Sequence, residues 1–108
     1  MIFCLRTVTV PTAVRQSFLD WIAENRAVRE EHGILLELVL EPSSGEGETV
    51  VITAWPSHEV FDAWLATPDR DRLTAPSAHQ AVDYRPITRY KVAGGYVNVT
   101  ALAKEAEA

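Results

Sequence analysis

The sequence contains a single cysteine, Cys4, which excludes an internal disulfide framework and any metal site built from several cysteines. It also lacks an apolar run of the roughly 18 residues that a membrane-spanning helix needs. Its first residues, Met-Ile-Phe-Cys-Leu-Arg-Thr-Val, have the pattern of a strand and not of a signal peptide. We therefore expect a cytoplasmic protein that does not bind a membrane.

Basic residues are scarce as well. The chain has 10 lysines and arginines against 15 aspartates and glutamates, and its net charge is −5. Because binding to nucleic-acid phosphates needs a basic surface, we expect no nucleic-acid partner. The charge is uneven: residues 20–48 are strongly acidic, whereas residues 69–91 carry more arginine and lysine than aspartate. The second segment is either an ordinary solvated surface or the rim of a site for an anionic small molecule.

With 108 residues, of which 47% are hydrophobic, the chain has the size of one domain with its own core. Apolar periodicity and β-branched residues predict strands at residues 2–10, 34–40, 49–55 and 86–92. Helical spacing predicts helices at 13–32 and 57–67, the second with Ser57 as N-cap. A short helical turn is expected at 77–83, and a small helix at 101–108.

The order strand, helix, strand, strand, helix, strand is that of the ferredoxin-like fold. We predict an α+β domain at residues 1–92, with a four-stranded antiparallel sheet and two helices on one face. Residues 93–108 form a C-terminal extension. Both faces of the central strands are apolar, since Leu36 and Leu38 face one way while Leu35 and Val39 face the other. A monomer rarely exposes such a surface, so we predict a homodimer that packs sheet against sheet.

Three segments resemble the antibiotic biosynthesis monooxygenase family. They are a helix ending in Glu-Glu-His-Gly, a strand ending in Trp55-Pro-Ser, and the following His-Glu-Val-Phe-Asp-Ala-Trp64-Leu. The resemblance implies a dimeric α+β barrel that oxidises quinols or aromatic polyketides with O₂ and without cofactor or metal. It also leaves open a relative that binds or degrades haem, or a non-catalytic dimer that binds a small ligand.

The resemblance places a pocket between the helices and the sheet, with Trp64 over a planar aromatic substrate. Phe18, Trp21 and Phe61 would complete an aromatic wall, although all four rings also suit plain core packing. Asn25 falls on the same helical stripe as Phe18. Its amide either donates a hydrogen bond to a substrate oxygen or finds a structural partner.

The remaining candidates lie in the basic segment. His79 has the pKa range of a base near neutral pH, and it is alternatively a surface residue. In haem-degrading relatives a histidine after the second helix binds iron, but His79 lies further from Trp64 than that ligand does. Tyr84 and Arg85 precede the last strand, where they are candidates to bind a phenolate or carboxylate.

Overall fold

A computed structural model describes the backbone at residues 1–73 and 81–107. The sheet is antiparallel throughout, and its strands lie in the order β2 (Leu36–Leu40), β3 (Thr49–Trp55) and β1 (Ile2–Thr9). The fourth position is shared by β4 (Asp83–Tyr84) and β5 (Thr88–Lys91), which pair with opposite ends of β1. The expected α+β class and ferredoxin-like sheet are confirmed.

The last strand differs from the prediction because the edge is broken in two. β4 pairs with Val8 and Thr9, and β5 pairs with Ile2 through Leu5, so no ladder partner stands beside Arg6 on this side. Pro86 lies in the break. Because proline has no backbone N–H to donate to a ladder, it interrupts pairing at this point.

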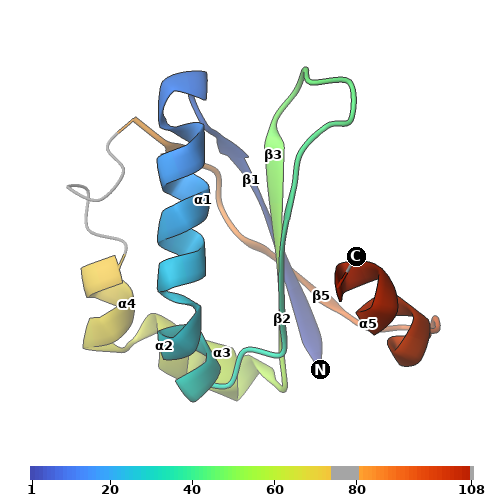
Figure 1. The fold of residues 1–108 in the computed structure, drawn as a ribbon. Coiled ribbons are helices and arrows are strands. Elements are labelled where there is room, and N and C mark those ends of the chain that lie inside the picture. The colour runs from blue at the N-terminus through green and yellow to red at the C-terminus, as the bar shows by residue number, and fades with distance from the viewer. Residues whose placement is uncertain (74–80, 108) are drawn as a thin grey trace.

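The helices η1 (Thr12–Val14), α1 (Arg15–Glu24), α2 (Arg26–Glu31), α3 (His58–Leu65) and α4 (Pro68–Leu73) lie on one side of the sheet, and α5 (Val99–Glu107) lies on the other (Figure 1). Ser57 is the N-cap of α3 as expected, since its side chain accepts a hydrogen bond from the Val60 N–H. The turn expected at 77–83 falls mainly outside the described residues, and its last residue, Asp83, belongs to β4. In the described part of the chain, no helix is long and apolar enough to span a membrane.

The continuous helix expected at 13–32 is wrong, because the chain leaves helical geometry at Asn25. This residue has φ −98° and ψ 8° and separates α1 from α2. Its side-chain Nδ2 donates to the Trp21 carbonyl oxygen at 2.8 Å. The same carbonyl also accepts from the Asn25 backbone N–H at 3.2 Å, so the side chain adds a second donor to a helical acceptor at the break.

The covered face of the sheet carries two separate apolar clusters. One gathers Trp55 of β3 with Phe61 and Trp64 of α3, and the other gathers Val8 of β1 with Phe18 of α1. Side chains alternate along a strand, so Ile2, Cys4, Arg6 and Val8 of β1 all face the helices. The charged member of this series therefore lies between the two clusters.

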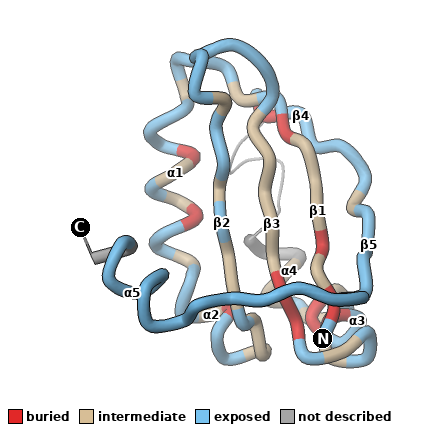
Figure 2. Tube along the Cα trace, turned by 90° about the vertical axis from the view of Figure 1, so that its right-hand side faces the viewer, coloured by how far each residue is buried: buried red, intermediate tan, exposed pale blue. Residues whose placement is uncertain are grey.

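The opposite face of the sheet is open along β2. Leu38 and Leu40 are 45% and 44% exposed, and Tyr90 of β5 is 53% exposed. The chain after β5 crosses this side of the strands before α5 begins (Figure 2), yet Tyr96 within that segment remains 86% exposed. The segment therefore leaves an apolar surface uncovered in the single chain.

Candidate functional site

Two adjoining cavities lie between the sheet and the helices that cover it. The first, of about 120 Å³, lies against α3, and the second, of about 130 Å³, lies against α1. Both are lined by Arg6, Arg29, Val51 and Thr53. Because three of these residues belong to β1 and β3, the cavities meet over the middle of the sheet.

The aromatic residues singled out in the sequence are divided between these cavities. Phe61 and Trp64 line the first, whereas Phe18, Trp21 and Tyr84 line the second. The Phe18 and Trp21 ring centroids are 6.5 Å apart. In the first cavity Trp55, which was not predicted as a site residue, adds a third ring 6.1 Å from that of Trp64. The expected single wall is thus two walls, one beneath each helix.

Two other predicted residues, Asn25 and Arg85, lie outside the two cavities. Asn25 bonds the Trp21 carbonyl and is not among the residues that line the two cavities. Arg85 is exposed, and its backbone N–H donates to the Thr7 carbonyl at 3.1 Å. His79 lies outside the described residues.

Arg6 is a further lining residue that was not predicted from the sequence. Its guanidinium lies over the Tyr84 ring, 5.4 Å from the centroid, and its Nε is buried without a hydrogen-bond partner among the described residues. Burial lowers the pKa of Arg6, and the neighbouring Arg70 cation lowers it further, while Tyr84 acts in the opposite direction. The available signal was the strand alternation, which puts this one charge on the apolar face of β1.

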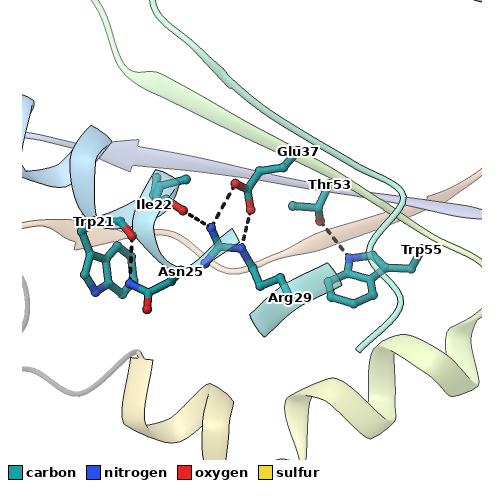
Figure 3. A network of polar contacts seen from close by, with 7 residues as sticks. All are labelled: Trp21, Ile22, Asn25, Arg29, Glu37, Thr53 and Trp55. Carbon is teal, nitrogen blue, oxygen red and sulfur yellow. Dashed lines mark hydrogen bonds and ion pairs between the residues drawn. The ribbon is translucent and has the colours of Figure 1, made fainter. Parts of the chain in front are cut away.

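Arg29 is the second cation missed, and its guanidinium forms an ion pair with Glu37. Its Nε lies 2.5 Å from Glu37 Oε2, and its Nη2 donates to Glu37 Oε1 at 3.0 Å and to the Ile22 carbonyl (Figure 3). Arg29 therefore links α1, α2 and β2. Buried charges need partners of this kind, and the pair fixes the helices over the sheet.

Residues behind the walls are also engaged. His32 Nε2 lies 3.1 Å from Asp69 Oδ2, and the His32 ring centroid is 5.0 Å from that of Trp64. Burial raises the pKa of Cys4, so this lining thiol is protonated at neutral pH. In the described part of the chain, no group of His, Cys, Asp or Glu side chains could hold a metal ion.

The family model for antibiotic biosynthesis monooxygenases matches residues 1–75. The chain belongs to this family. The resemblance noted in its sequence is confirmed. No curated protein sequence matches the chain.

Solved structures of the family share this fold. A Deinococcus radiodurans protein assigned to the antibiotic biosynthesis monooxygenases is 25% identical, with TM-score 0.71 over 91% of this chain and 97% of that one. The cofactor-independent oxygenase SnoaB of Streptomyces nogalater is 18% identical, with TM-score 0.72 over 87% and 94% of the two chains. The haem-degrader MhuD of Mycobacterium tuberculosis is 22% identical, with TM-score 0.71 over 90% and 100%. One fold therefore serves both an oxygenase and a haem degrader.

Replacing Arg29 by methionine is expected to destabilise the protein strongly, because it leaves the Glu37 carboxylate buried without a partner. The expected loss in free energy of unfolding is about 3–5 kcal/mol, measured by urea denaturation. The matched control is Arg15→Met, which breaks the exposed Arg15–Glu41 ion pair and should hardly move the midpoint. The double variant Arg29→Met/Glu37→Leu should recover much of the loss. Equal effects of the two single variants would contradict the assigned role of Arg29.

Proposed function

We propose that the protein is a cofactor-independent monooxygenase that oxidises a small planar aromatic substrate, quinol or polyketide-like, with O₂. The observation that carries the proposal is the pair of adjoining cavities, each walled by aromatic rings of the overlying helix. Flat rings suit walls of this kind, because aromatic side chains favour stacked or edge-to-face contact with another ring. The shared fold of SnoaB, itself a cofactor-independent oxygenase, adds support.

Cavity volume favours a small substrate. Each cavity is close in size to the roughly 150 Å³ apolar cavity that takes up benzene in another protein. One aromatic ring fits each cavity, and a fused bicyclic ring system would extend across the residues that both share. A bound ring that displaced water from these cavities would also protect a reactive anion from water.

The proposed reaction balances with O₂ as the only co-substrate. A phenol with a free ring position and O₂ give a quinone and water. One oxygen atom becomes the new ring carbonyl, and the other leaves as water with two hydrogens of the substrate. The substrate supplies all four electrons, so it must ionise readily to an electron-rich anion. The protein would bind and orient that anion.

Within this proposal, Trp64 is the wall against which the reacting ring lies, and Phe61, Phe18 and Trp21 complete the enclosure. Asn25 would act as a hydrogen-bond donor only if its amide exchanged the Trp21 carbonyl for a substrate oxygen. His79 as the base remains a prediction from the sequence, as does the contribution of Arg85. The Asn25→Ala variant distinguishes a structural role of the amide from a role in substrate binding. If the role is purely structural, the substitution lowers the free energy of unfolding and leaves kcat unchanged.

Replacing Trp64 by leucine is expected to lower kcat/KM at least tenfold, because one aromatic wall is lost. The measurement is O₂ consumption with a panel of naphthalenediols and anthrone, corrected for spontaneous oxidation. Arg26→Met is the control, since this side chain is exposed on α2 and lies outside both cavities. No enzymatic oxidation of any panel member would overturn the proposal. A haemin-induced Soret shift in that case would favour haem as the ligand.

We propose that the active unit is a homodimer joined through the open face of the sheet. Leu38 and Leu40 lie exposed on that face, and pairing it with a second copy would bury them. Light scattering should give twice the 12.0 kDa chain mass. Leu38→Lys should yield monomers, whereas Ala27→Lys on the exposed side of α2 should not. A monomeric parent protein at micromolar concentration would contradict this assembly.

A further inference from the structure

The lining of the two cavities carries an excess of positive charge. Among the described lining residues, Arg6, Arg29 and Arg70 are cations and Glu37 is the single carboxylate. Glu37 is already engaged by Arg29 through both of its oxygens. Glu37 is thus not available to neutralise Arg6.

Arg6 differs from the paired arginines of the same fold. Arg29 has Glu37, Arg15 has Glu41, and Arg89 has Asp62 as ion-pair partners. No ion pair of the described residues includes Arg6, and its buried Nε donates to no described acceptor. A buried donor on a charged group is costly to leave unpaired, so this position favours an acceptor supplied by a bound ligand.

The surroundings of Arg6 define what that acceptor is. The guanidinium lies where the two cavities meet, so a group bound to it lies beside both aromatic walls. Tyr84 covers the guanidinium as a ring face and offers no negative charge at neutral pH, because burial raises the pKa of its hydroxyl. Thr53, which also lines both cavities, already accepts from Trp55 Nε1 at 3.0 Å. The free space therefore favours an anionic oxygen attached to an aromatic ring.

We infer that Arg6 is the anion-binding residue of the site, and that the substrate is an aromatic compound held there through an ionised hydroxyl or carboxylate. This inference rests on the proposed function and narrows its substrate class. Guanidinium binds such oxygens by charge-assisted hydrogen bonds. For a phenol, the interaction favours the phenolate, which is the electron-rich form that the proposed oxidation needs.

The test uses 4-nitrophenol, whose phenolate is distinguished from the phenol by its visible absorbance. Saturating wild-type protein should lower the apparent pKa of the bound probe by about one unit, which corresponds to roughly tenfold tighter binding of the phenolate. Arg6→Met should abolish this shift, and Arg6→Lys should retain part of it. Arg26→Met, which removes an exposed cation outside both cavities, should behave as wild type.

Two further measurements separate binding from folding. The neutral analogue 4-nitroanisole should bind wild type and Arg6→Met equally, since it has no ionisable hydroxyl. The melting temperature of Arg6→Met should equal or exceed that of wild type, because an unpaired buried charge is removed. An unchanged probe pKa in wild type, or an undiminished shift in Arg6→Met, would overturn the inference.

The probe also separates this inference from the proposed oxidation. The readout involves no O₂ consumption, so an Arg6-dependent shift without turnover of the diol panel would retract the reaction and keep the anion site. Turnover that is retained in Arg6→Met would keep the reaction and retract the anion site.

Discussion

The ion pair between Arg29 and Glu37 holds α1 and α2 over the sheet. It joins the end of α1, the short helix α2 and the strand β2 through one side chain. Apolar packing alone would draw α1 and α3 against the strands until the space between them was filled. The ion pair constrains α1 and α2 at this point, because neither partner can move without losing a buried contact. Arg29 lines both cavities, so the ion pair lies at the boundary between them.

The rings of the two apolar clusters on either side of this ion pair contribute both to core packing and to the lining of the cavities. Trp55, Phe61 and Trp64 are nearly buried and contact one another, yet they also line the first cavity. Core packing and pocket lining are therefore not alternatives for these rings. The same argument applies to Phe18, which is 2% exposed and lines the second cavity.

The fold was largely predictable from the sequence, because strand alternation and helical spacing are local patterns. They located β1, β3 and α3, and the motif around Trp55 and Trp64 identified the family. The helix break at Asn25 was not predicted, since apolar spacing continues through it. The site was predicted less well. Periodicity indicates that an arginine faces inward, as at Arg6, but not whether a carboxylate distant in sequence will meet it. Glu37 meets Arg29 and leaves Arg6 unmatched, and that choice depends on the three-dimensional arrangement.

The broken edge of the sheet leaves the centre of β1 with a ladder partner on one side only. On one side, Arg6 is opposite Val51 in a continuous ladder, whereas on the other side it faces the gap between β4 and β5. Most strand residues in the interior of a sheet are held from both sides. Across the gap the described residues hold β1 by the Arg85 N–H at the Thr7 carbonyl and by no ladder pair, so the backbone beside Arg6 is held more weakly than the rest of the strand. A ligand bound to Arg6 would stabilise the strand at its most flexible point. Binding would therefore slow amide hydrogen exchange along the middle of β1.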